Sequence, residues 1–244
     1  LFLQGGASFQ FSMIPMNIMT INKKFDIIHT GAWTEKAIKE GKKFGEVNVV
    51  ASSEDTTFTY IPDLDKINFT PDADYVHICY NNTIYGTKYS RLPETGDVPI
   101  VCDMSSCILS EPYNVADYGI IFAGAQKNIG PAGVTIVIIR KDLMERAPGN
   151  LPAMLDFRTH AESDSLFNTP PTYAIYIAKL VFEWLESLGG VEAIHRINLE
   201  KSGLLYDFID SSSMFKGNVE KNSRSLMNVT FSTGSNELDD KFIK

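Results

Sequence analysis

Short, β-branched apolar runs alternate along this chain with amphipathic stretches of helical length, and this alternation restricts the fold more than any other feature. Strands that alternate with helices are typical of an α/β layered fold with a largely parallel sheet. The apolar runs predict strands within residues 1–6, 24–31, 46–52, 74–81, 99–105, 118–124 and 133–140. They are strand-sized and far shorter than a membrane span, so we expect a soluble protein.

The stretches between the first strands predict helices over residues 7–19 and 32–45. In the first helix Phe11, Ile14 and Ile18 fall on one side, and Pro15 must kink the helix or lie near its start. Glycine ends the second helix.

After residue 150 the pattern changes to two consecutive long helices, over 168–190 and 191–212, followed by a strand over 225–233. Thr169 is the expected N-cap of the first of these helices, with Gly189 as its end. We expect a large domain over 1–190, then a connector helix and the start of a small α+β domain over 191–244. Because the chain begins without methionine and ends without an obvious terminal element, we expect both domains to be incomplete.

Charge and cysteine content narrow the classes of partner. With 22 Lys and Arg against 30 Asp and Glu, the net charge of −8 disfavours nucleic acid and anionic membranes as main partners. Cys79, Cys102 and Cys107 lie in apolar or small-residue settings without ligand spacing, which favours reduced core thiols in a cytoplasmic protein. No disulfide, metal site or leader segment is indicated.

Lys127 follows the predicted strand 118–124, and ligands of open α/β sheets bind at the carboxyl ends of strands. Most lysines are simply solvated. Here the small residues 123–125 leave room for a ligand, and the glycine- and proline-containing turn 128–133 fixes the loop. We expect a half-buried pocket that disfavours the ammonium form and makes the amine a nucleophile towards a carbonyl.

Asp103 ends another predicted strand, one crossover before Lys127. Alone, Asp103 would be interpreted as an N-cap or turn residue. Together the two residues match what pyridoxal phosphate (PLP) requires, namely a lysine for the Schiff base and a carboxylate that keeps the pyridine nitrogen protonated. The pair therefore favours a PLP enzyme.

A phosphorylated aromatic cofactor also needs amide donors and a flat side chain. Gly5 and Gly6 join a strand to a helix, where the amides at Ala7 and Ser8 could hold a phosphate at the positive end of the helix dipole. Trp33, at the start of the next helix, could stack on the ring. Each signal is weak alone, because most glycine turns bind nothing and a lone tryptophan is more often a core residue.

With these residues identified, the chain resembles the phosphoserine aminotransferases, which are class V, PLP-dependent enzymes of the aspartate aminotransferase (type I) fold. The segments GAQKNIGPAG (124–133) and NTPPT (168–172) are its most specific features, and the resemblance covers nearly the whole chain. It implies a mostly parallel mixed sheet between helices, followed by a small C-terminal domain.

The resemblance implies roles for four residues around the cofactor ring. Lys127 would form the Schiff base and transfer the proton in transamination, while Asp103 would pair with the pyridine nitrogen. Trp33 would stack on the ring. Thr83 would bond the ring oxygen, although by itself it reads as an ordinary turn residue.

The resemblance also implies contacts to the cofactor phosphate. Ala7 and Ser8 would supply backbone and hydroxyl donors, with Gln126 beside them. Asn168 and Thr169 would reach the phosphate from the other subunit, so that a homodimer completes each site.

The implied reaction moves the amino group of L-glutamate to 3-phosphohydroxypyruvate, giving O-phospho-L-serine and 2-oxoglutarate in serine biosynthesis. The family's substrate-binding histidines and arginines belong to segments outside this chain, and we interpret His29, His77, His160 and His195 as structural or surface residues. The alternatives are another type I PLP aminotransferase, such as an alanine:glyoxylate enzyme, or a catalytically inactive dimeric scaffold of the same fold. A cysteine desulfurase is disfavoured because its reactive cysteine needs an exposed loop.

Overall fold

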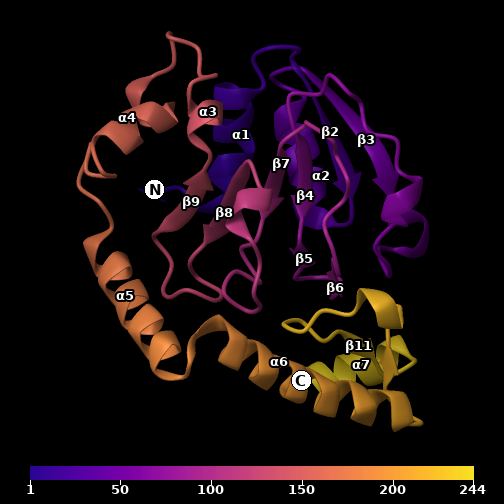
Figure 1. Cartoon of the computed structure of the whole chain (residues 1–244). Helices are drawn as coiled ribbons and strands as arrows, with labels where there is room; N and C mark the ends of the chain where they lie inside the picture. The colour runs from indigo at the N-terminus through magenta and orange to yellow at the C-terminus, as the bar shows by residue number, and fades with distance from the viewer.

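A seven-stranded mixed sheet forms the centre of the computed structural model, which describes residues 1–244 (Figure 1). Its strands lie in the order β1-β9-β8-β7-β4-β2-β3. Their bounds are β1 Phe2–Leu3, β2 Lys24–His29, β3 Glu46–Ser52, β4 Val76–Cys79, β7 Ile100–Asp103, β8 Ile120–Gly124 and β9 Thr135–Ile139. Each lies within a predicted strand, and the α/β fold class is confirmed.

Strand direction decides which loops meet. The strands β2, β3, β4, β7 and β8 pair in parallel, whereas β9 is antiparallel to both β8 and β1. Because β9 is antiparallel to both of these neighbours, β1 runs in the same direction as β8. The carboxyl ends of β1, β4, β7 and β8 therefore lie at one edge of the sheet.

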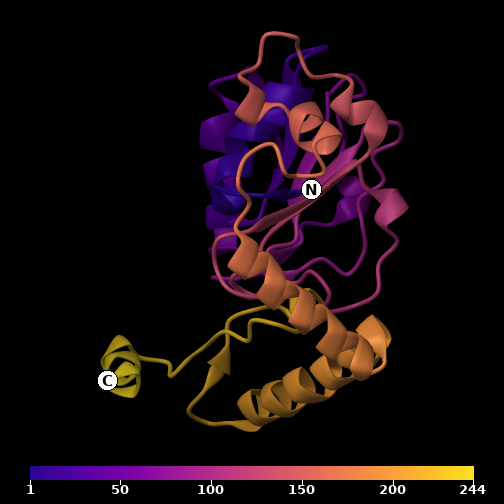
Figure 2. The ribbon, with the colours of Figure 1, turned by 90° about the vertical axis from the view of Figure 1, so that its left-hand side faces the viewer.

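Both faces of the sheet are covered, as parallel strands require. Ile120 and Phe122 of β8 belong to the core on the side of the first two helices, whereas Ile121 and Ala123 belong to the core on the other face. This alternation is the two-residue period of a strand. Figure 2 shows the indigo and violet helices packed on one side of the sheet.

Helix α1, Gly6–Ile18, contains Pro15 in its last turn and not near its start, and the helix ends three residues later. Phe11, Ile14 and Ile18 are buried, which confirms the predicted inner side. Helix α2, Ala32–Gly41, packs beside α1 and buries Ile38 in the same core.

The later helices are α3 Lys141–Met144, α4 Phe157–Glu162, α5 Thr172–Ser187 and α6 Gly190–Ser211. The prediction that Thr169 caps α5 is wrong, since the N-cap is Pro171 and no side chain caps the helix. Two consecutive prolines move the start of the helix past the threonine. Ala174 and Ala178 of α5 pack into the core of the second face.

The C-terminal part contains β10 Lys216–Gly217, β11 Phe231–Ser232 and α7 Asn236–Ile243, and α7 projects away from the rest (Figure 2). The predicted strand over 225–233 is reduced to β11, because the preceding residues bond to another hairpin instead of to a sheet. The domain boundary near residue 190 stays a prediction.

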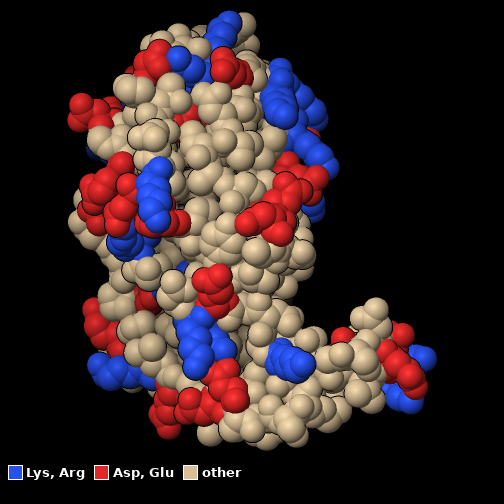
Figure 3. All heavy atoms as spheres, turned by 90° about the vertical axis from the view of Figure 1, so that its right-hand side faces the viewer, with Lys and Arg blue, Asp and Glu red and all other residues tan.

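A short hairpin, β5 Asn81–Asn82 and β6 Thr87–Lys88, follows β4 directly. No helix is both long and apolar enough to cross a membrane. Charged side chains of both signs surround a broad uncharged area on the face shown in Figure 3.

Candidate active site

A cavity of about 480 Å³ lies where the carboxyl ends of the central strands meet the first turn of α1. This location is the one expected for ligands of open α/β sheets. It brings together residues from five separate segments: Gly6, Ala7, Ser8, Trp33, Cys79, Asn81, Thr83, Asp103, Ser105, Ser106, Gln126 and Lys127.

Lys127 reaches the cavity from the loop after β8. Its Nζ donates to Thr83 Oγ1 at 2.7 Å and lies 5.1 Å from the centre of the Trp33 ring. The expectation of a half-buried lysine is wrong, because Lys127 is exposed. Ala125 is the last buried residue before Lys127, and burial resumes only at Ile129.

Asp103 is the last residue of β7, the parallel neighbour of β8, and is only 5% exposed. Its Oδ1 accepts a hydrogen bond from the backbone N–H of Ser105 at 2.9 Å, and it takes part in no salt bridge. Burial raises the pKa of the Asp103 carboxyl, although the Ser105 hydrogen bonds and the charge of Lys127 oppose this. The carboxylate therefore lies in a setting that a cation would stabilise.

The turn between β1 and α1 forms another wall of the cavity. Gly5 has φ 91°, and a Cβ there would lie 2.8 Å from Phe9 Cβ, so only glycine fits. The first turn of α1 has no acidic residue and no side-chain cap, which leaves its N–H groups free to bind an anion. Ala7 and Ser8 belong to this turn, as predicted.

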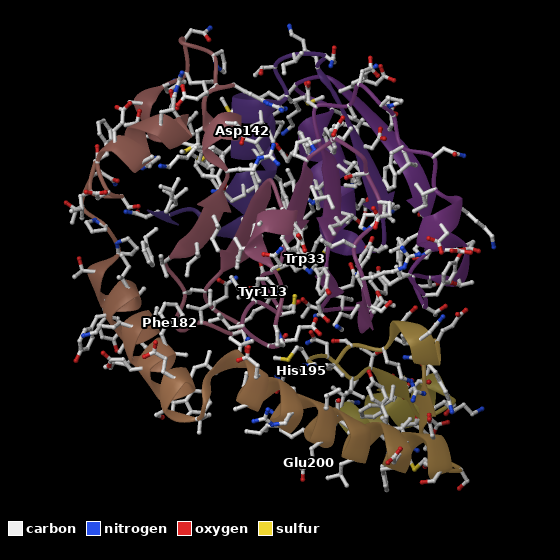
Figure 4. The ribbon with its side chains drawn as sticks, viewed as in Figure 1. Trp33, Tyr113, Asp142, Phe182, His195 and Glu200 are labelled. Atoms are coloured by element: carbon white, nitrogen blue, oxygen red, sulfur yellow. The ribbon has the colours of Figure 1, made fainter.

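Trp33 is held by the start of α2. Thr34 Oγ1 accepts from the backbone N–H groups of Thr30 and Gly31, at 3.1 Å each, and so fixes the first turn of the helix. Trp33, labelled in Figure 4 near the lower ends of the strands, is half-buried, and its ring faces the Lys127 Nζ at 5.1 Å. A flat apolar face is thus available beside the lysine.

The structure brings Gln126 to the cavity but not Asn168 or Thr169. Both of these residues are exposed, and Asn168 lines a separate cavity of about 660 Å³ on the other side of the β1–α1 turn. Thr169 is tied to that turn, since its carbonyl accepts from Gln4 Nε2 at 3.0 Å.

Sequence reasoning missed four residues that line the cavity, namely Cys79, Asn81, Ser105 and Ser106. Ser105 Oγ accepts from the backbone N–H of Gly124 at 3.1 Å and so connects the ends of β7 and β8. Asn81, Ser105 and Ser106 could have been found from the sequence, because each is a polar residue close after a buried strand.

The cavity residues fit pyridoxal phosphate. A buried carboxylate without a cationic partner, a free helix N-terminus for a phosphate, an aromatic face and an accessible lysine lie around one space. The Trp33 Nε1 atom is buried without a hydrogen-bond partner, which is also typical of a site completed by a ligand. No group of three or more His, Cys, Asp or Glu side chains is placed to hold a metal ion.

Comparison with known proteins agrees with this geometry. The family model "Aminotransferase class-V" matches residues 1–244. A phosphoserine aminotransferase of Geobacillus kaustophilus is 55% identical over all of this chain, which spans 68% of its length.

Two solved structures are also similar over the whole chain. The phosphoserine aminotransferase of Bacillus circulans subsp. alkalophilus has a TM-score of 0.97 and 45% identity, with 68% of that chain covered. The PLP-bound phosphoserine aminotransferase of Trichomonas vaginalis has a TM-score of 0.92 and 37% identity, with 70% covered. The chain therefore belongs to the aminotransferase class-V family of PLP-dependent enzymes, and its similarity to the phosphoserine aminotransferases extends over all 244 residues.

Proposed function

We propose that the protein transfers the amino group of L-glutamate to 3-phosphohydroxypyruvate, giving O-phospho-L-serine and 2-oxoglutarate in serine biosynthesis. The observation that carries this proposal is the pairing of Lys127 and Asp103 at the ends of neighbouring parallel strands, in a chain 55% identical to a phosphoserine aminotransferase. The substrates are small molecules that share the cavity with the cofactor.

Bound pyridoxal phosphate supplies an aldehyde that bonds amines and a ring that withdraws electrons from the carbon beside the bonded nitrogen. The Lys127 amine is the group in this cavity that can bond the aldehyde and later accept the α-proton of glutamate. The same amine would return a proton to the α-carbon of the new amino acid. Because Lys127 is exposed, it can reach both positions without disturbing the core.

The other residues bind and orient. Asp103 would hold a proton on the ring nitrogen, which in turn stabilises its buried carboxylate. Thr83 directs the Lys127 nitrogen through its 2.7 Å contact, and Trp33 covers one face of the ring site. The free N–H groups at Ala7 and Ser8 would bind the phosphate together with Gln126.

Substrate preference tests the proposed function. With L-glutamate as donor, we expect 3-phosphohydroxypyruvate to be aminated with a kcat/KM about 100-fold or more above those of pyruvate and glyoxylate, because an acceptor without a phosphate would leave the family's phosphate-binding histidines and arginines unpaired. A coupled assay of 2-oxoglutarate measures each rate. A preference for glyoxylate would favour the alanine:glyoxylate alternative, and bound cofactor without turnover of any acceptor would favour the inactive scaffold.

We further propose that the protein is a homodimer in which Asn168 and Thr169 complete the partner's site. Three observations support it: both residues are exposed, they lie outside their own chain's cavity, and they follow an apolar segment that is also exposed, with Leu166 66% and Phe167 48% accessible. On α5, Tyr173, Tyr176 and Trp184 add exposed apolar area at helical spacing. The three buried free cysteines favour the cytoplasm as its location.

Mixing two inactive variants tests the shared site. Lys127→Ala and the double variant Asn168→Ala, Thr169→Ala are each expected to be inactive, whereas their refolded mixture should recover about one quarter of the parent activity. Half of the dimers are then mixed, and one of the two sites in each mixed dimer is intact. No recovery, although co-purification of differently tagged chains shows mixed dimers, would mean that Asn168 and Thr169 act within their own chain.

A further inference from the structure

The β5–β6 hairpin lies between the cofactor cavity and the C-terminal segment 224–230. Figure 1 shows β5 and β6 at the lower end of the sheet, next to the yellow C-terminal part. The turn of this hairpin carries Thr83, the hydroxyl partner of Lys127. The position of the hairpin therefore sets the position of a group in the site.

Asn81 of this hairpin connects the cofactor cavity to the C-terminal segment. It is 2% exposed and lines the cavity. Its Nδ2 donates to Ser106 Oγ at 2.7 Å and to Asn228 Oδ1 at 2.8 Å, while its Oδ1 accepts from Ser225 Oγ. Both amide hydrogens and the oxygen of Asn81 are thus used, and two of its three partners belong to the C-terminal segment.

The C-terminal segment also bonds two backbone carbonyls of the hairpin. Ser225 N–H donates to the carbonyl of Gly86 at 2.8 Å, and Thr230 Oγ1 donates to the carbonyl of Tyr85 at 3.1 Å. Gly86 has φ 78°, and a Cβ there would lie 2.6 Å from Thr230 Oγ1. This close approach makes the hairpin and the segment one packed unit.

We infer that Asn81 is a positioning residue that couples the C-terminal segment to the cofactor cavity, because it holds β5, and with it Thr83, in place against Lys127. The inference rests on the proposed function, since its effect is observed through the cofactor bound at Lys127. Asn81 acts here through Thr83 and Ser106, and no contact of its own with the reacting atoms is required.

The test replaces the partners of Asn81 in the C-terminal segment, which lie away from the cavity. In protein loaded with pyridoxal phosphate, Asn228→Ala and Ser225→Ala are expected to lower kcat about tenfold with little change in the KM for glutamate. They should also move the pH midpoint of the visible absorbance of the bound cofactor, because the Thr83 hydroxyl that contacts the Lys127 nitrogen at 2.7 Å is displaced. Asn81→Ala should show both effects, and combining it with Asn228→Ala should add little.

Tyr206→Phe is the matched control. The Tyr206 hydroxyl donates to the carbonyl of Ser225 at 2.8 Å, so its removal also costs a buried hydrogen bond in the C-terminal segment but leaves the contacts of Asn81 intact. We expect the parent kcat and midpoint in this variant. The inference is overturned if Asn228→Ala and Ser225→Ala keep the parent values, or if Tyr206→Phe changes them equally. A parent protein without the cofactor band would instead contradict the proposed function, and the inference with it.

Discussion

Replacing Lys127 with alanine is expected to reduce transamination by about 10⁴-fold or more, because it removes both the amine that bonds the cofactor and the group that moves the α-proton. Steady-state kcat with L-glutamate and 3-phosphohydroxypyruvate measures the loss. Borohydride reduction of the parent protein, followed by peptide mass analysis, should find the cofactor attached to Lys127 alone.

Lys36→Ala is the control for this variant. The Lys36 ammonium lies over the same Trp33 ring, 4.4 Å from its centre, but Lys36 does not line the cavity. We expect its kcat to stay within about twofold of the parent, in keeping with the small effects of surface substitutions. Label on Lys36, or an equal loss of activity in the two variants, would contradict the assignment of Lys127.

The stability of Lys127→Ala distinguishes chemistry from folding. Because Lys127 is exposed and contributes nothing to either core, we expect the free energy of unfolding without cofactor to change by only about 0.5 kcal/mol. Urea unfolding of the cofactor-free protein measures it. A large loss of stability would show that the activity was lost through the fold.

Asp103→Asn is expected to lower kcat by about 10²- to 10⁴-fold, because a neutral amide cannot hold the ring nitrogen in its protonated form. Asparagine has nearly the same size and keeps an oxygen to accept from the Ser105 N–H, so the backbone of β7 should be preserved. Unchanged kcat would show that Asp103 has no part in the chemistry.

In the cofactor-free protein, Asp103→Asn should instead raise the stability of the fold at neutral pH. Burial raises the pKa of the Asp103 carboxyl in the folded state, so its favourable contribution is present below the pKa of the unfolded chain and is lost as pH rises through the folded value. Asparagine does not titrate. Relative to the parent, Asp103→Asn should therefore be more stable at pH 7 than at pH 4, as measured by urea unfolding at both values.

Asp210→Asn provides a control of opposite sign. Arg224 holds the pKa of the Asp210 carboxyl down at about 2, so that carboxylate stabilises the fold above the pKa of the unfolded chain, and this is lost only as pH falls towards 2. Asp210→Asn should be less stable than the parent at pH 7, and the difference should shrink in acid. Equal pH trends in the two variants would rule out burial of Asp103 as the cause.

Added pyridoxal phosphate should reverse the order of Asp103→Asn and the parent at pH 7, because only the parent carboxylate gains a cationic partner. A ligand that binds the native state stabilises it in proportion to its affinity. The buried carboxylate thus destabilises the empty protein and favours the loaded one.

Much of the fold could be predicted from local sequence because strand burial and helix burial follow simple periods. The run around Phe122 is β-branched and apolar on both faces, which only a buried strand satisfies. Lys127 and Asp103 could be paired because each directly follows such a strand, and carboxyl ends of neighbouring parallel strands meet at one edge.

Other expectations failed where contacts distant in sequence decide. Thr169 had the right side chain for an N-cap, but α5 begins only after the two prolines that follow it. The Thr169 carbonyl instead accepts a hydrogen bond from Gln4. Lys127 was expected to be half-buried from the small residues before it, yet exposure depends on what packs above the loop. The run 225–233 is apolar enough for a strand, but its Ser225 N–H and its Thr230 hydroxyl bond the β5–β6 hairpin.

The sequence by itself determined the layered α/β fold, the strand ends that carry Lys127 and Asp103, and the glycine turn before α1, because each depends on residues that are neighbours in the chain. Only the tertiary structure decided that Asn81 meets Ser106, Ser225 and Asn228, and that Asn168 and Thr169 lie outside the cavity of their own chain. Those relations depend on the strand order and on the path of α5 and α6, which no local pattern encodes.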